Sequence, residues 1–319
     1  MWISLMDKFK KLLVISKLFN NWPSLMIGYI LNKIGFCVKL RARIDNCVFE
    51  IQPDIFARLV SRFSRGLIKS IECVNDKLFV NGMEVDSIDD VIFNHDIWVK
   101  VLGWKYNGSY WVKDNIKFKY FYDTMLEIFN YNEYGMLNVD GRDVVDVGAF
   151  VGDSAIYFAL KGAKRVIAIE PHPGAYAEML ENIRLNNLEG VIVPLNAGLA
   201  GKPGRIRVGG VSEEETGQVY HRPSEVGEVD AITLGEIVEK YGIGEGAVLK
   251  MDCEGCEYDV ILNDYEHVRL FDEILFECHA YITKIPVRVL LEKLSRDFEC
   301  EIARGLGKEQ LGYVRCVKK

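Results

Sequence analysis

A glycine turn between two apolar segments is the part of the sequence best suited to chemistry. Residues 144–147 lead into Gly148 and Gly152, and a second apolar segment, 166–169, ends at Glu170. Glycines at such a turn let the backbone approach a ligand and open the next helix N-terminus toward it. A carboxylate about 20 residues later can accept hydrogen bonds from both hydroxyls of a ribose. The spacing therefore predicts one mononucleotide-binding βαβ unit.

The form of the turn narrows the choice of ligand. It reads D-x-G-x-x-x-G, so it lacks the third glycine that a pyrophosphate cofactor requires. Asp146 and Asp153 flank the glycines and suit a ligand that carries an amino group and a positive centre. These features favour S-adenosylmethionine over a dinucleotide.

Ionisable side chains gather at the ends of two later apolar segments. The segments are 247–252 and 273–279, and the side chains are Asp252, Glu254, Glu257, Glu277 and His279. Carboxylates collected at a strand tip are costly unless they have a function or partners. Asp252 or His279 could act as a general base. The imidazole of His279 is the side chain that titrates nearest to neutral pH.

Two other interpretations of this cluster stay open. Asp252, Glu277 and His279 could bind a divalent metal that acidifies a hydroxyl. Glu254 and Glu257 could instead cap the following helix. We predict Asp252, His279 and Glu254 as catalytic residues and assign no metal ligand.

The elements that position these residues alternate between β and α. We expect strands at 143–148, 165–170, 190–195, 247–252, 273–279, 298–304 and 313–317, and helices near 153–162, 174–187, 232–241 and 286–297. Such alternation predicts a mostly parallel sheet with helices on both faces, followed by a final antiparallel hairpin. Ligands of such sheets bind at the carboxyl ends of the strands. Asn196, after the third strand, could bond an adenine base or simply belong to a turn.

The first part of the chain differs in character. We expect an N-terminal α+β extension over 1–120 and a catalytic domain over 121–319. Within the extension we expect an amphipathic helix in 1–20, a second helix at 25–31, a hairpin in 36–51, a helix at 53–65 and short aromatic-rich strands in 70–118. The first helix could contact a membrane surface, or it could pack on the protein. The aromatic residues form either a binding surface or a core.

The distribution of charges and cysteines limits the expected partners and location of the protein. Residues 1–120 carry 18 Lys and Arg against 12 Asp and Glu, whereas residues 121–319 carry 21 against 34. An acidic catalytic region disfavours nucleic-acid partners. The eight cysteines show no framework spacing, so we expect reduced thiols, Cys253 and Cys256 included. With no signal peptide and no long apolar segment, we expect a cytoplasmic location without a transmembrane helix.

Five motifs together resemble the FkbM-type methyltransferases. They are D-V-G-A-F-V-G-D-S from Asp146, Glu170-Pro171, N-I-R-L-N from Asn182, Thr233-Leu234, and K-M-D-C-E-G-C-E from Lys250. The resemblance covers about 120–319. It implies a class I, Rossmann-like α/β fold with a seven-stranded sheet, S-adenosylmethionine as cofactor, and O-methylation of a hydroxyl on a sugar or small metabolite.

The resemblance also implies where the cofactor binds. It places the cofactor on Asp146, Gly148, Gly152, Glu170 and Asn196, with Asp252 beside it, and we add the neighbouring Ala149, Asp153, Ser154 and Pro171. The acceptor is expected to be a small molecule or glycan, with residues 200–229 as a lid or acceptor loop. Residues 182–190 are also similar to tRNA guanine methyltransferases, which makes RNA methylation the alternative. A non-catalytic cofactor-binding module is a second alternative.

Overall fold

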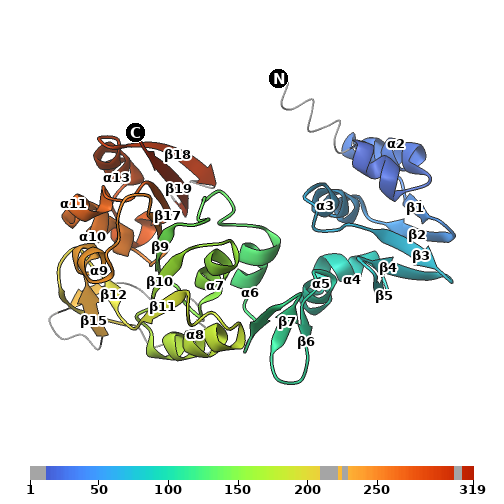
Figure 1. Ribbon diagram of the computed structural model, residues 1–319. Coiled ribbons are helices and arrows are strands. Elements are labelled where there is room, and N and C mark those ends of the chain that lie inside the picture. Colours follow the sequence, from blue (N-terminus) through green and yellow to red (C-terminus); the bar gives the residue numbers. More distant parts are fainter. Residues whose placement is uncertain (1–11, 209–221, 225–228, 305–310) are drawn as a thin grey trace. The chain divides into compact units, whose positions relative to one another are not determined.

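The chain divides into two compact units. The computed structural model describes residues 12–208, 222–224, 229–304 and 311–319, and the units are Met1–Ile116 and Lys117–Lys319 (Figure 1). Among the described residues, no helix combines the length and the apolar character needed to cross a membrane.

The N-terminal unit consists of short helices and small antiparallel sheets. Its elements are α2 (Trp22–Lys33), β1 (Leu40–Ile44), β2 (Cys47–Ile51), α3 (Pro53–Ser64), β3 (Ile71–Val74), β4 (Lys77–Val80), β5 (Met83–Val85), α4 (Ile88–Phe93), α5 (His95–Val101), β6 (Lys105–Tyr106) and β7 (Trp111–Lys113), and β8 (Ile116–Phe118) follows at the boundary. Trp98 and Trp104 are buried, as a core role requires, whereas Tyr106 is exposed. Residues 12–18 are helical. The membrane-surface hypothesis for residues 1–20 falls mostly outside the described residues and stays a prediction.

Helices α4 and α5 correct the expectation of strands throughout 70–118. The side chain of Ser87 accepts a hydrogen bond from the Asp90 N–H, and that of Asn94 accepts one from the Ile97 N–H. Each bond satisfies a backbone donor that the first helical turn leaves unpaired. These two caps begin short helices in a segment whose β-branched and aromatic residues favour strands.

The C-terminal unit is built on the expected seven-stranded sheet. In sheet order the strands are β11 (Ile192–Leu195), β10 (Arg165–Ile169), β9 (Asp143–Val147), β16 (Val248–Met251), β17 (Glu273–His279), β19 (Leu311–Lys318) and β18 (Phe298–Arg304). The first five strands pair in parallel, and β19 pairs antiparallel with both of its neighbours. This confirms the class I α/β prediction, including the final hairpin.

Helices connect the strands and complete the core. They are α6 (Asp123–Met125), the π-helix η1 (Leu126–Asn130), α7 (Asp153–Leu160), α8 (Pro173–Leu185), α9 (Leu234–Tyr241), α10 (Cys256–Asn263), α11 (Tyr265–Val268), α12 (Ala280–Thr283) and α13 (Val287–Leu294). The chain order along the sheet reverses between β9 and β16, because β10 and β11 lie on one side of β9 and the later strands on the other. A crevice therefore opens at the carboxyl ends of these strands.

A second, smaller sheet occupies part of the segment expected to be a lid or acceptor loop. It contains β12 (Gly198–Leu199), β15 (Val229–Ile232), β13 (Gly204–Arg207) and β14 (Arg222–Ser224), in that order. Its apolar side chains Ile206, Val229 and Ala231 are buried together. Residues 209–221 and 225–228 lie outside the described part of the chain.

Three disulfides correct the prediction of reduced cysteines. They join Cys47 to Cys73, Cys253 to Cys256 and Cys300 to Cys316. The last pair lies directly opposite in the register of β18 and β19, a placement that sequence spacing alone does not reveal. Because disulfides are rare in reducing compartments, the expected cytoplasmic location loses the support it drew from free thiols.

This pairing predicts the outcome of alkylation. Iodoacetamide added to the denatured, unreduced protein is expected to modify Cys37 and Cys278 only, because the other six sulfurs are bonded. After reduction, all eight cysteines of the sequence should react. Peptide mass spectrometry gives both patterns, and alkylation of Cys253 before reduction would contradict the pairing at α10.

Candidate active site

A cavity of about 750 Å³ lies in the C-terminal unit at the carboxyl ends of the central strands. Its size is that of a site for a small ligand. The predicted cofactor residues that line it are Gly148, Asp153, Ser154, Glu170, Pro171 and Asp252. Among the residues lining it, Asp146, Ala149, Gly152 and Asn196 do not appear. The structure thus brings together six of the ten predicted positions.

Glu170 follows β10 and is only 4% exposed. Its carboxylate accepts the backbone N–H of Phe150 at 2.9 Å and that of His172 at 2.7 Å. Burial raises its pKa to about 7, although both hydrogen bonds favour the ionised form. Each carboxylate oxygen keeps a lone pair for a second donor. Glu170 can therefore still accept hydrogen bonds from the hydroxyl groups of a ligand.

Gly148 is required where β9 ends. A Cβ atom there would lie 1.7 Å from the carbonyl oxygen of Asp252, and the residue has φ +73°. Both observations exclude a larger side chain. The glycine therefore lets the tips of β9 and β16 approach each other under the cavity.

Asp146 lies beneath the cavity rather than in its wall. It is opposite Lys250 in the register of β9 and β16, and the ammonium is 3.0 Å from its carboxylate. Both side chains are almost completely buried. Burial opposes the charge on Lys250, but Asp146 outweighs it and the Lys250 pKa is raised. Lys250 also donates to the Gly148 carbonyl at 2.9 Å, so the pair holds the glycine turn in place.

The side chain of Asn196 is hydrogen-bonded to the backbone. Its side-chain amide donates to the carbonyl oxygens of Glu170 and Pro171, at 2.9 and 3.2 Å. The cavity wall near the end of β10 is instead apolar, with Leu199 and Ile206 in the lining. An aromatic base would therefore meet apolar side chains there, and Asn196 fixes the loop behind them.

The predicted ionisable cluster does assemble. Asp252, Glu254 and Glu277 line the cavity, and the His279 ring lies behind them with 2% of its side chain exposed. The Nδ1 atom of His279 is 3.1 Å from the buried Glu257 carboxylate. The Nε2 atom points at the three lining carboxylates from 3.9, 3.6 and 3.7 Å, respectively.

The electrostatics of the cluster separate its members. Burial alone would lower the pKa of His279, but the hydrogen bond to Glu257 and the surrounding carboxylates raise it to about 9. Burial, helped by the charge of Asp252, raises the pKa of Glu277 to about 9, and burial also raises the pKa of Glu254. His279 and Glu277 therefore hold protons at neutral pH. Asp252 and Glu254 are the other carboxylates of the cluster that line the cavity.

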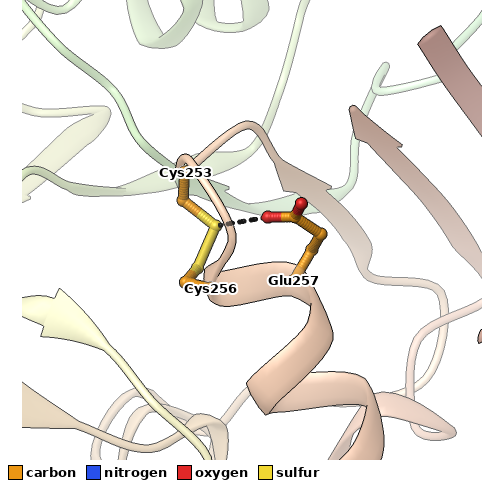
Figure 2. A group of neighbouring side chains, drawn as sticks. All are labelled: Cys253, Cys256 and Glu257. Atoms are coloured by element: carbon orange, nitrogen blue, oxygen red, sulfur yellow. Dashed lines mark hydrogen bonds between the residues drawn. A yellow bond between two sulfur atoms is a disulfide. The ribbon is translucent and has the colours of Figure 1, made fainter. Parts of the chain in front are cut away.

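Glu257 links the cluster to the start of α10. One oxygen accepts the backbone N–H of His279 at 2.9 Å, and the other accepts that of Gly255 at 3.0 Å. The second oxygen also lies 3.5 Å from the sulfur of Cys253, which is bonded to the sulfur of Cys256 (Figure 2). Because these sulfurs are bonded to each other, they are not thiolate ligands for a metal. Glu257 thus binds the backbone N–H of Gly255, the residue before α10, and it orients His279 as well.

Two tyrosines of the site escaped prediction from the sequence. The Tyr134 hydroxyl donates to Asp252 and the Tyr313 hydroxyl donates to Glu277, each at 3.3 Å. Tyr313 lies opposite Glu277 in the register of β17 and β19, so aligning the final hairpin would have found it. Tyr134 follows the π-helix η1 in an irregular segment, where no periodicity marks it. π-helices occur often at functional sites.

The cavity fits S-adenosylmethionine. Glu170 offers a carboxylate to a ribose, Gly148 lets the backbone come close, and Leu199 and Ile206 offer an apolar wall to a base. Acidic side chains at the far end, Asp252 and Glu254 among them, suit the positive sulfonium.

Comparisons with known proteins agree with this fit. Residues 146–299 match the Methyltransferase FkbM domain. The hexuronic acid methyltransferase AglP of Haloferax volcanii is 28% identical over 170 residues, which span 50% of this chain and 69% of that protein.

Several solved methyltransferase structures are similar to this chain at lower sequence identity. A putative rRNA methylase from Clostridium thermocellum has a TM-score of 0.40 at 13% identity, covering 60% of this chain and 93% of that one. An O-methyltransferase from Bacillus cereus, solved with S-adenosylhomocysteine (SAH), has a TM-score of 0.37 at 12% identity, covering 63% and 92%. Because these TM-scores are below 0.5, we base no conclusion on them. The matched domain and the strand order carry the assignment: residues 146–299 are a methyltransferase FkbM domain, and the protein is an S-adenosylmethionine-dependent methyltransferase.

Proposed function

We propose that the protein transfers a methyl group from S-adenosylmethionine to a hydroxyl of a sugar. The observation that carries this proposal is the position of Asp252 and Glu254 in the wall of the same cavity that holds Glu170. The likeness to a hexuronic acid methyltransferase supports a sugar as the acceptor. Hexose and hexuronic acid glycosides are therefore the first acceptors to examine.

The chemistry requires a proton acceptor. The cofactor supplies an electrophilic methyl group on a sulfonium. The acceptor oxygen forms the new bond to this methyl, the carbon–sulfur bond breaks, and the hydroxyl proton must leave. Asp252 and Glu254 are the carboxylates able to take that proton, while Tyr134 orients Asp252 through its hydrogen bond.

Methylation of RNA is less compatible with the charge of the cavity. Its described lining includes the carboxylates of Asp123, Glu127, Glu133, Asp153, Glu170, Asp252, Glu254 and Glu277. Lys250 is the one basic residue among the described lining residues, and it is paired with Asp146. Such a wall repels the many phosphates of an RNA backbone more strongly than the single carboxylate of a hexuronic acid.

Methyl transfer from tritiated S-adenosylmethionine distinguishes the two acceptor classes. The protein is incubated with hexose glycosides, hexuronic acid glycosides and, separately, total RNA. We expect label in a sugar product and none in RNA. Label that appears in RNA alone would refute the proposal.

Cofactor affinity is expected to depend on pH through Glu170. Its pKa of about 7 means that it takes up a proton below neutral pH. Ribose hydroxyls donate to the ionised form, so SAH affinity should be constant above about pH 8 and fall below pH 7, by up to about tenfold per pH unit. Isothermal titration calorimetry between pH 8 and 5.5 measures this. Glu170→Gln should bind weakly with a flat profile, and an unchanged slope in this variant would exclude Glu170 as the titrating group.

A further inference from the structure

The Nε2 atom of His279 faces three carboxylates at distances longer than a hydrogen bond. Its Nε2 atom lies 3.6 to 3.9 Å from oxygens of Asp252, Glu254 and Glu277. These separations exceed a hydrogen bond, so within the described part of the chain Nε2 has no hydrogen-bond partner, although the side chain is only 2% exposed. The contacts that the described residues offer to Nε2 are therefore ion-pair contacts with these three carboxylates.

We infer that Asp252, Glu277 and His279 form a divalent-cation site at the edge of the cavity. One donor atom from each lies within 4.8 Å of the others. Two ligands that are each about 2.1 Å from one ion are separated by about 3 Å when adjacent and about 4.2 Å when opposite. The distances from Nε2 to Asp252 and Glu277, 3.9 and 3.7 Å, fall between these limits. The spacing is too long for hydrogen bonds and correct for ligands that share an ion.

The surrounding residues hold the three donors in the required orientation. Glu257 accepts from the Nδ1 side of His279, so Nε2 is the nitrogen that faces the three carboxylates. A cation bound there would displace the Nε2 proton. A carboxylate behind a ligating imidazole is the usual support in metal sites. The hydroxyls of Tyr134 and Tyr313 fix the carboxylates of Asp252 and Glu277 in the same way.

Charge also favours a cation here. Asp252, Glu254 and Glu277 converge on one end of the cavity, and the one Lys or Arg of its described lining, Lys250, is 3.0 Å from Asp146. Two carboxylates and one imidazole suit Mn²⁺, or Mg²⁺ with water completing its coordination. Asp252 and Glu277 line the cavity, so an ion that they hold would be reached from it. If the proposed function is correct, an acceptor hydroxyl binds there and becomes more acidic, with Glu254 left as the free carboxylate.

Binding of Mn²⁺ to the full-length protein, followed by electron paramagnetic resonance, tests the site without acceptor or cofactor. We expect the signal of free Mn²⁺ to decrease on addition of protein and to return with excess Mg²⁺. Asp252→Asn and Glu277→Gln should each weaken Mn²⁺ binding at least about tenfold. Asp230→Asn is the matched control, since it removes one carboxylate from an exposed position that does not line the cavity. SAH titration of each variant confirms that the fold is retained.

The outcomes separate this inference from the proposed function. A free Mn²⁺ signal that stays unchanged at about 1 mM protein would overturn the inference. So would equal Mn²⁺ affinity in wild type, Asp252→Asn and Glu277→Gln. A protein that binds Mn²⁺ through these residues but methylates no sugar would refute the proposed function and leave the cation site established.

Discussion

Replacing Lys250 by Met is expected to lower the free energy of unfolding by about 3–5 kcal/mol. The substitution keeps most of the side-chain volume but leaves the Asp146 carboxylate, which is 0% exposed, without its partner. An uncompensated buried charge costs more than the ion pair contributes, because the carboxylate cannot regain its hydration. Urea denaturation followed by circular dichroism measures the change.

The double variant Lys250→Met/Asp146→Asn provides the control. The introduced amide would carry no charge and could still accept the hydrogen bond that Ser154 donates to Asp146, which is 2.6 Å in the native protein. The double variant should therefore be more stable than Lys250→Met alone. Additive losses from the two substitutions would show that the pair is not coupled and that the buried charge is not the cause.

Replacing Asp252 by Asn is expected to lower kcat for methyl transfer by about 10²–10⁴-fold. Asp252 lines the cavity beside Glu254, and an amide can neither take the hydroxyl proton nor act as an anionic ligand. The affinity for SAH should change by no more than about threefold, because Glu170 and the glycine turn are untouched. Single-turnover kinetics together with SAH calorimetry provide the two values.

Glu277→Gln shows how Asp252 acts. Glu277 holds a proton at neutral pH in the metal-free protein, and a glutamine resembles the protonated carboxyl. If Asp252 works only as a base, Glu277→Gln should lose little activity. If the two residues share a cation, both variants should lose activity together. Full activity of Asp252→Asn would remove this residue from the mechanism.

Apolar strands and the residues that follow them were predictable for a simple reason. A parallel strand buried on both faces must be apolar along its length, so β9, β10 and β16 stand out in the sequence. The residues after them then share one edge of the sheet. Of the residues that this reasoning singled out, Glu170, Asp252, Glu254 and Glu277 line the cavity.

Contacts between distant segments were not predictable in this way. The disulfide between Cys300 and Cys316 depends on hairpin register, and the placement of Asn196 behind the cavity depends on its bonds to two carbonyls. The sheet of β12, β13, β14 and β15 arises from strands of two to four residues, which are too short to show a period.

The amino-acid sequence by itself determined the alternation of strands and helices and the residues at the strand ends, because local periodicity and glycine spacing encode them. Tertiary structure alone decided which of these positions reach the cavity. It paired Asp146 with Lys250 beneath the cavity, and it brought the hydroxyls of Tyr134 and Tyr313 to the carboxylates of Asp252 and Glu277. It also set the Nε2 atom of His279 among oxygens at the spacing of ligands. The physical reason is that side-chain direction and charge pairing depend on packing between segments far apart in the chain.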